Sequence, residues 1–275
     1  MILQGSCLQK VKELSPLSIQ TVVTSPPYWG LRDYDDKNQL GQEETPEEFL
    51  FKLVEIFSEI RDKLKDDGTV WVNIGDTYFG AKGGAWEGKN SITTAETGEE
   101  YRIKRKAPPK HRYLKTKDLV GIPWNFAIMM QKKGWYLRQD IIWHKPVPMP
   151  ESVNDRLQKS HEHIFLFTKK PNYYFDAEAI GLPKKEGDGW VRRHDVWDIP
   201  TSNYQGAHFA VFPEKLPEIC IKASTKEGDV VLDPFMGSGT TAYVSQRLGR
   251  RWVGIEINPE YVKIIKNRTA QEELF

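Results

Sequence analysis

The stretch Asp233-Pro234-Phe235-Met236-Gly237-Ser238-Gly239-Thr240-Thr241 decides the fold of this chain. It follows a short apolar run at 229–233, as expected where a buried parallel strand ends in a loop at the carboxyl edge of a sheet. The two glycines allow the backbone to approach a ligand closely, and Thr240 opens a helix pattern whose amide groups would point at that ligand. The next apolar run, 251–256, ends in Glu256, an acid placed to accept hydrogen bonds from ribose hydroxyls. The pattern therefore predicts a nucleoside-binding loop.

Two other interpretations of this loop stay open. A phosphate-binding loop would need a lysine after the second glycine, where Thr240 and Thr241 stand. A tight strand-to-helix turn that binds no ligand has the same local pattern.

A second loop, Thr24-Ser25-Pro26-Pro27-Tyr28-Trp29, follows the apolar run 20–24. Its two prolines fix the backbone and remove two amide donors, which leaves carbonyl oxygens and the Ser25 hydroxyl as acceptors beside the Tyr28 ring. Such a site suits a planar substrate with an amino group, such as cytosine or adenine, which must be rotated out of a duplex to be reached. The alternative is a rigid Pro-Pro turn with a packing tyrosine. Two ligand loops on one sheet edge suggest two substrates.

Alternating strand and helix patterns predict an α/β fold with a mainly parallel, seven-stranded sheet covered on both faces. Strands are expected at 2–3, 20–24, 69–74, 137–143, 163–168, 229–233 and 251–256, and helices from Pro46 to a stop at Asp66-Asp67-Gly68 and at 118–133, 214–223, 240–248 and 259–267. Residues 80–115 lack an apolar period and predict a long basic loop. Residues 146–205 mix proline, aromatic and basic residues and predict a small additional region.

The bulk composition is that of a soluble globular protein, with 275 residues, 39% hydrophobic residues and a formal net charge of +1. Cys7 and Cys220 show no metal-ligand or disulfide spacing, which favours a reducing interior. No apolar run approaches the ~20 residues that span a bilayer, and the first residues lack a signal peptide. We therefore expect a cytoplasmic protein without a membrane partner.

Taken together, the two loops resemble the β class of S-adenosylmethionine-dependent DNA methyltransferases, which modify exocyclic amino groups. In that class Ser-Pro-Pro-Tyr precedes the loop Asp-Pro-Phe-x-Gly-Ser-Gly-Thr-Thr, as it does here, and the stretches 72–78, 142–146 and 208–216 are also similar to family segments. The resemblance implies a Rossmann-like methyltransferase sheet of seven strands that is circularly permuted, with the catalytic motif before the cofactor motif and the first and last strands as neighbours. It also implies a catalytic half at 1–145 with a flexible basic loop at 80–115, a target-recognition region at 146–205 that includes the last sheet strand, and a cofactor-binding half at 206–275.

The resemblance further implies residue roles. The flipped base would be held by Ser25, Pro26, Pro27 and Tyr28. The cofactor, S-adenosyl-L-methionine, would be bound by Phe212, Pro213, Asp233, Pro234, Phe235, Gly237, Ser238, Gly239, Thr240 and Glu256. Double-stranded DNA would be bound by a basic block that includes Arg102, Lys104, Arg105, Lys106 and Arg112. One departure from the family is Gly5-Ser6, where an acid after the glycine often contacts the cofactor's adenine.

The implied activity is site-specific methylation of DNA by base flipping and direct displacement. Ser25 favours N4 of cytosine, because family members with Ser at this position mostly modify cytosine, whereas those with Asp or Asn mostly modify N6 of adenine, which stays the alternative. A methyltransferase acting on RNA or a small molecule, and a catalytically silent DNA-binding protein, are further alternatives. The resemblance is compatible with a separately acting restriction endonuclease and with a monomer or a homodimer. No metal is required, and His144, His161 and His163 lack a complete ligand set.

Overall fold

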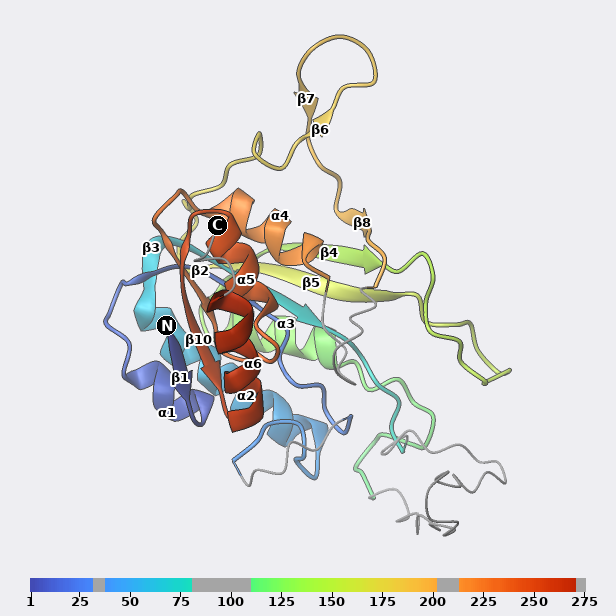
Figure 1. Cartoon of the computed structure of the whole chain (residues 1–275). Helices are drawn as coiled ribbons and strands as arrows, with labels where there is room; N and C mark the ends of the chain where they lie inside the picture. The colour runs from blue at the N-terminus through green and yellow to red at the C-terminus, as the bar shows by residue number, and fades with distance from the viewer. Residues whose placement is uncertain (32–37, 81–109, 202–212, 271–275) are drawn as a thin grey trace, which may run out of the picture.

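A computed structural model gives the fold of residues 1–31, 38–80, 110–201 and 213–270, and its centre is one mixed sheet (Figure 1). The strand order is β1-β10-β9-β2-β3-β5-β4-β8, and a separate hairpin pairs β6 with β7. The strands are β1 (Ile2–Gln4), β2 (Ile19–Thr24), β3 (Leu64–Ile74), β4 (Tyr136–His144), β5 (His161–Thr168), β6 (Leu182–Pro183), β7 (Trp190–Val191), β8 (Val196–Asp198), β9 (Val230–Asp233) and β10 (Arg251–Glu256). Among the described strands of the main sheet, only β5 runs antiparallel to its neighbours. The predicted mainly parallel α/β sheet is therefore confirmed.

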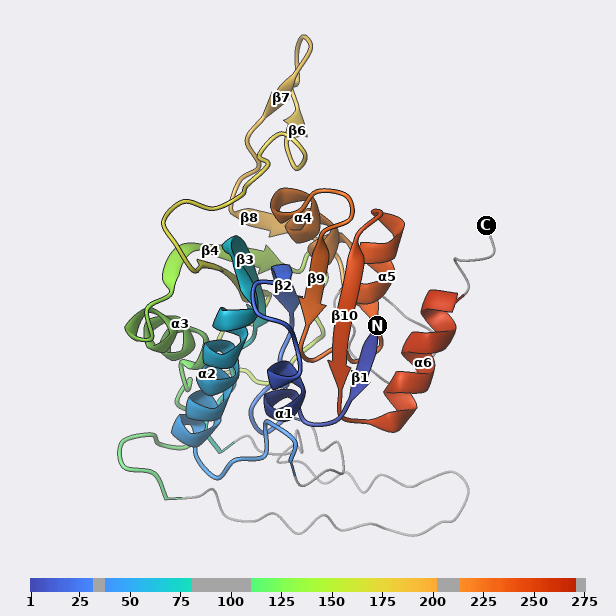
Figure 2. The ribbon, with the colours of Figure 1, turned by 90° about the vertical axis from the view of Figure 1, so that its left-hand side faces the viewer.

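The first and last strands of the described chain are neighbours in the sheet. Ile2, Leu3 and Gln4 pair with Gly254, Ile255 and Glu256, and Figure 2 shows β1 beside β10. The expected adjacency of the two terminal segments is thus confirmed. Because β9 pairs with β2, the sequence-distant strands that precede the two loops also lie side by side.

Helices cover both faces of the sheet. The helices are α1 (Cys7–Lys12), α2 (Pro46–Lys63), α3 (Ile122–Lys132), α4 (Lys215–Ser224), α5 (Thr240–Arg247) and α6 (Pro259–Ala270). One buried cluster joins the sheet to α1, α2 and α3 through residues such as Val11, Phe57 and Phe126. Another joins it to α4 and α5 through Ile221 and Val244. Figure 1 shows α4 above strands β4 and β5 and α3 below them.

Two expectations about the elements were wrong. Within the described residues the sheet has eight strands instead of seven, because the three-residue β8 adds to the edge of β4, and so short a run has no readable period. The helix α2 does not end at Asp66-Asp67-Gly68, since β3 begins at Leu64, directly after Lys63. Leu64 is fully buried, and a Cβ at position 68 would lie 2.7 Å from its Cγ, so Gly68 allows the strand to pass this point.

No helix in residues 1–31, 38–80, 110–201 and 213–270 is long and apolar enough to cross a membrane.

Candidate active site

The two loops meet at the carboxyl edge of β2 and β9. Thr24 Oγ1 donates a hydrogen bond of 2.6 Å to Asp233 Oδ1, and Thr241 Oγ1 lies 3.3 Å from the carbonyl oxygen of Val23. Thr24 and Asp233 are each about 1% exposed. A buried bond therefore fixes the base of the Ser25 loop to the base of the Asp233 loop.

Asp233 shapes its loop from within. Its carboxylate accepts from Thr24, from the backbone amide of Phe235 at 3.0 Å and from Thr241 Oγ1 at 2.7 Å. Burial raises the pKa of Asp233 to about 6, although these hydrogen bonds lower it. With most of its lone pairs used inside the protein, Asp233 holds the turn that presents the glycines.

The glycine positions leave room for a ligand. Gly237 has φ +52°, and an added Cβ there would meet only the Phe235 carbonyl oxygen, 4.0 Å away. Gly239, with φ +84°, differs, because its Cβ would lie 3.1 Å from Ile265 Cγ1. Gly239 therefore permits close packing of α6, whereas Gly237 borders open space in front of the amino end of α5.

Glu256 lies beside this space. Its Oε2 accepts from the Gly237 amide and its Oε1 from the Asn258 amide, both at 2.8 Å, and each carboxylate oxygen retains a lone pair. Burial raises the pKa of Glu256 to about 7. The Gly5 amide donates to the Glu256 carbonyl at 2.9 Å, so the atypical Gly5-Ser6 pair adjoins the same acid. A buried carboxylate beside an open backbone cradle fits the ribose of a nucleoside cofactor.

Other predicted cofactor residues surround the loop. Pro234 is buried and Phe235 half-buried, and the Ser238 carbonyl lies 3.5 Å from Arg268 Nη1. Arg268 also donates to Thr240 Oγ1 at 3.2 Å and to Glu214 Oε1 at 2.9 Å. This bridge brings buried Pro213, the neighbour of Glu214, next to the start of α5. Phe212 lies outside the described residues.

The hydroxyl of Tyr28 lies in a network that joins the Ser25 loop to β3 and β5. It donates to Glu162 Oε2 at 2.5 Å, and Asn73 Nδ2 lies 3.1 Å from the Tyr28 oxygen, 2.9 Å from Glu162 Oε2 and 3.4 Å from Ser25 Oγ. Lys145, directly after β4, forms an ion pair with Glu162 Oε1. The predicted base-binding residues are therefore connected to one buried carboxylate.

The charges in this network are defined by burial and by Lys145. Burial alone would raise the pKa of Glu162, but the Lys145 ammonium and the hydrogen bonds that Glu162 accepts lower the pKa below its usual value. Burial, and then the negative charge of Glu162, raise the pKa of Tyr28. Glu162 is thus an anion and Tyr28 a neutral donor at neutral pH.

The Tyr28 ring is positioned by the absence of a side chain at Gly75. A Cβ at position 75 would lie 2.7 Å from Tyr28 Cε2 and 3.3 Å from two further ring atoms. Next to it, Asp76 accepts from the backbone amides of Gly121 and Ile122 at 3.0 Å and so caps α3. The segment after β3 therefore forms one wall of the Tyr28 site.

No role was predicted for Asn73, Gly75 or Glu162, and none in the base site for Lys145. Asn73 and Gly75 fall within 72–78 and Lys145 within 142–146. Both stretches resemble family segments, so the sequence marked these positions as family-like but did not indicate what they do. For Glu162 no local motif exists. Glu162 reaches the site because β5 pairs antiparallel with β3. His163 lies opposite Ile74, the last residue of β3, so Glu162, which precedes His163, lies next to the segment that follows β3.

The predicted DNA-binding block is only partly within the described residues. Arg112 is exposed, and its neighbours His111 and Tyr113 hold Glu47 at the start of α2 through contacts of 3.0 and 2.9 Å. Arg102, Lys104, Arg105 and Lys106 lie outside the described residues.

Two of the three histidines considered as metal ligands each pair with an aspartate. His144 Nδ1 lies 2.6 Å from Asp198 Oδ1, and His163 Nδ1 lies 2.9 Å from Asp140 Oδ1. In the part of the chain that the structure describes, no group of three or more His, Cys, Asp or Glu side chains is arranged to hold a metal ion.

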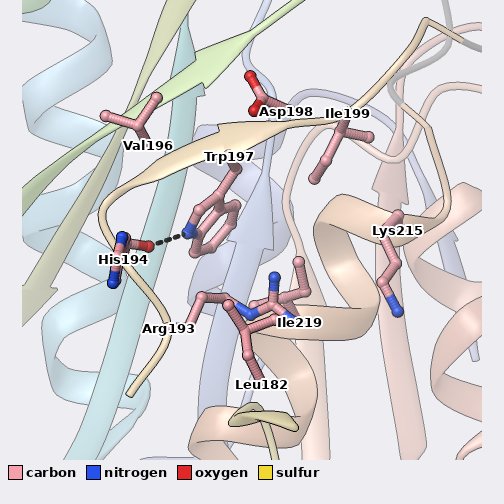
Figure 3. A pocket seen from close by; sticks show the side chains of 9 residues that line it. All are labelled: Leu182, Arg193, His194, Val196, Trp197, Asp198, Ile199, Lys215 and Ile219. Carbon is pink, nitrogen blue, oxygen red and sulfur yellow. Dashed lines mark hydrogen bonds between the residues drawn. The ribbon is translucent and has the colours of Figure 1, made fainter. Parts of the chain in front are cut away.

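A cavity of about 290 Å³ lies between β8 and α4 (Figure 3). Trp197 lies in its wall, and the indole donates to the His194 carbonyl at 2.8 Å. Its lining is Leu182, Arg193, His194, Val196, Trp197, Asp198, Ile199, Lys215 and Ile219, and none of these belongs to either loop. The chemistry is therefore assigned to the sheet edge and not to this cavity.

The fold is that of an α/β methyltransferase, with the Ser25 and Asp233 loops side by side at one edge of the sheet. The model of the DNA methylase family for N6 and N4 methyltransferases matches residues 19–267, and the chain belongs to this family. It is a DNA methyltransferase of the N4/N6 type.

Relatives of known class are similar over nearly the whole chain. Type II methyltransferase M.Cfr9I of Citrobacter freundii is 47% identical over 272 residues, which cover 99% of this chain and 88% of that protein. Type II methyltransferase M.SmaI of Serratia marcescens is 46% identical and covers 97% of this chain and 89% of that protein.

Solved structures share the fold. The cytosine-N4-specific PvuII DNA methyltransferase aligns with a TM-score of 0.72 at 24% identity, over 97% of this chain and 85% of that chain. A Thermus thermophilus protein named as a putative DNA modification methylase, solved with S-adenosyl-L-methionine, aligns with a TM-score of 0.68 at 26% identity, over 98% of this chain and 93% of that chain.

Proposed function

We propose that this enzyme transfers a methyl group from S-adenosylmethionine to the exocyclic N4 of cytosine at specific sites in DNA. The observation that carries the proposal is the buried Thr24–Asp233 hydrogen bond of 2.6 Å, because it places the amino-group loop against the nucleoside loop. Methyl transfer in one step needs both substrates held in line at close range. Loops joined at their bases supply that alignment.

S-adenosylmethionine is the cofactor, and when bound it supplies a methyl group already activated on a sulfonium. The chain's own residues fit it: Glu256 accepts from ribose hydroxyls, and the space in front of Gly237 admits the ligand against the backbone. Asp233 holds this cradle without needing to touch the ligand.

The Ser25 loop positions the base. The Ser25 hydroxyl and the carbonyl oxygens of the two following prolines are candidate acceptors for the two hydrogens of the amino group, and accepting them frees its lone pair for attack. One of these hydrogens leaves to solvent as a proton once the nitrogen is methylated. Asn73 Oδ1 is a buried acceptor with no hydrogen-bond partner among the described residues, and such an atom costs about 1–3 kcal/mol until a donor reaches it. An entering amino group is such a donor.

The buried carboxylate of Glu162 stabilises the reacting base without contacting it, through Tyr28 and Asn73. Positive charge develops on the attacking nitrogen, and the Oε2 side of Glu162 faces Tyr28 and Asn73, whose contacts lead to Ser25. Tyr28 supplies a ring surface for the flipped base and a hydroxyl that fixes its own orientation. Glu162 is thus a positioning residue.

The choice of cytosine rests on Ser25. Its neutral hydroxyl stands where adenine-modifying members of the family mostly carry Asp or Asn.

We also propose the permuted family order for the sheet, in which the catalytic strand β2 precedes the cofactor strand β9, with 146–205 as the target-recognition region. A restriction endonuclease acting separately on the same sequence is the partner activity that this function implies.

The product analysis is the direct test. DNA of mixed sequence is incubated with the protein and methyl-labelled S-adenosylmethionine, and its nucleosides are separated and identified by mass spectrometry. We expect labelled N4-methylcytosine. Labelled N6-methyladenine would refute the base assignment, and unlabelled DNA would refute the activity, leaving RNA methylation and silent DNA binding as the alternatives to test with the same label.

Cofactor affinity is expected to fall as the pH decreases through about 7. Ribose hydroxyls donate to the ionised carboxylate, so binding lowers the pKa of Glu256, which burial raises to about 7 in the free protein. Each pH unit below that value should weaken binding by roughly tenfold until the pKa of the bound state is reached. Equilibrium dialysis with labelled cofactor measures this, and Glu256→Gln should bind weakly with a flatter profile. A wild-type dissociation constant that does not change with pH would contradict the role of Glu256.

Charge reversal of Lys104, Arg105 and Lys106 to glutamate is expected to weaken DNA binding and to reduce its dependence on salt. Each cation that neutralises a phosphate contributes about one to the slope of log affinity against log salt. The control reverses Lys132 and Lys133, which are exposed near the end of α3 just before β4 begins. If both the triple variant and the control keep the wild-type slope, the 102–112 block is not part of the DNA contact.

A further inference from the structure

The segment 146–159, between β4 and β5, exposes apolar side chains in close succession. Leu157 is 92% exposed, Met149 81%, Val147 77% and Val153 43%. Single exposed apolar residues are normal on a protein surface, but a group on one short connection indicates a contact surface. Figure 1 shows this connection extending beyond the ends of β4 and β5.

The segment is stiff despite its exposure. Pro146, Pro148 and Pro150 fix their own backbone and restrict Val147 and Met149 to extended conformations. Its two arms are joined, because Gln158 Nε2 donates to the Met149 carbonyl at 3.0 Å and Arg156 pairs with Glu151 at 2.5 Å. Met149 therefore lies beside the 157–158 arm, and little conformational freedom remains to be lost on binding.

The two ends of the segment adjoin the residues that surround Tyr28. The Lys145 amide donates to the Ser160 carbonyl at 2.8 Å, and Lys145 and Glu162 form the ion pair behind Tyr28. Lys159 Nζ donates to the Asp76 carbonyl at 2.5 Å, and the Arg156 guanidinium lies 4.1 Å from the centre of the Tyr78 ring. The exposed apolar group is thus fixed in position relative to the site that receives the flipped base.

We propose that Met149 and Leu157 form a wedge that enters the DNA duplex and fills the gap left by the target base. The inference rests on the proposed function, since a base can reach Ser25 only after leaving its stack. The gap is bounded by apolar base faces, and apolar side chains are the groups that proteins insert between base steps. Arg156 and Lys159, on either side of Leu157 in the sequence, hold this arm against the base site through the Tyr78 ring and the Asp76 carbonyl. Occupation of the gap stabilises the unstacked duplex while the base stays in the Tyr28 site.

The test compares methylation of two duplexes that contain the sequence modified by the wild-type enzyme. In one duplex the target base is paired, and in the other it lies opposite an abasic site, so that unpairing is already complete. The Met149→Ala/Leu157→Ala double variant is expected to lose roughly 10- to 100-fold in kcat/KM on the paired duplex and to regain most of this loss on the abasic duplex. Leu17→Ala is the control, because Leu17 is a 51% exposed leucine that precedes β2, away from the connection between β4 and β5.

Other outcomes overturn the wedge. Equal rates of the double variant and wild type on the paired duplex would show that the side chains do not enter the DNA. An equal loss on both duplexes would show a general effect on the site. A wild-type dimer that the double variant dissociates, measured by light scattering, would identify the surface as a contact between subunits. If no DNA sequence is methylated by the wild-type enzyme, so that these duplexes cannot be designed, the proposed function itself is refuted.

Discussion

Replacement of Tyr28 by alanine is expected to lower kcat by roughly 10²-fold or more, while the dissociation constant of S-adenosylmethionine changes by less than about threefold. The ring supplies stacking for the flipped base, which is worth about 1–3 kcal/mol per base, and its loss also lets the base move relative to Ser25. The cofactor loop does not depend on the ring, because Asp233 is held by Thr24 and Thr241. Single-turnover methylation and equilibrium dialysis measure the two quantities.

Two further variants separate the roles of the ring and its hydroxyl. Tyr28→Phe keeps the stacking surface and removes the hydroxyl, with its bond of 2.5 Å to Glu162 and its contact of 3.1 Å with Asn73 Nδ2, so we expect a smaller loss than for alanine. Gly75→Ala keeps the whole tyrosine but displaces the ring, since the added Cβ would lie 2.7 Å from Cε2. It should lower kcat with unchanged cofactor affinity. An unchanged methylation rate in Tyr28→Ala would remove this residue from the base site.

The site could be predicted from sequence where its chemistry is local. The Ser25 and Asp233 loops are each a run of consecutive residues after an apolar strand, and strand alternation was enough to predict that both lie at one sheet edge. The bond between Thr24 and Asp233 follows from the pairing of β2 with β9. That pairing was not predicted, because the two strands are separated by most of the chain and no local pattern encodes it.

The network behind Tyr28 could not be predicted in the same way. Glu162 is one charged residue at the start of a strand, and its burial depends on the antiparallel register of β5 against β3 and on Lys145 from the end of β4. No spacing in one segment encodes a contact that needs three strands. The missed β8 has a similar cause, because its three residues are fixed by pairing with β4 and not by a period of their own.

Glu162→Gln is expected to lower both stability and the methylation rate. Glutamine cannot balance the Lys145 ammonium, and the side chains of Lys145 and Glu162 are only 19% and 11% exposed. Removing one partner of a buried ion pair costs about 3–5 kcal/mol, so the melting temperature should fall by several degrees. The rate should fall by roughly 10²-fold, since Tyr28 and Asn73 lose their anionic acceptor.

The double variant Glu162→Gln/Lys145→Met separates these two effects. Methionine removes the unpaired ammonium and retains an apolar stem, so most of the lost stability should return. The rate should stay low, because glutamine at position 162 supplies no negative charge to the network that reaches Ser25 through Asn73. A double variant that regains both stability and rate would reduce Glu162 to a structural ion pair. One that regains stability alone would show that the buried charge itself acts on the reaction, which ties the register of β5 directly to catalysis.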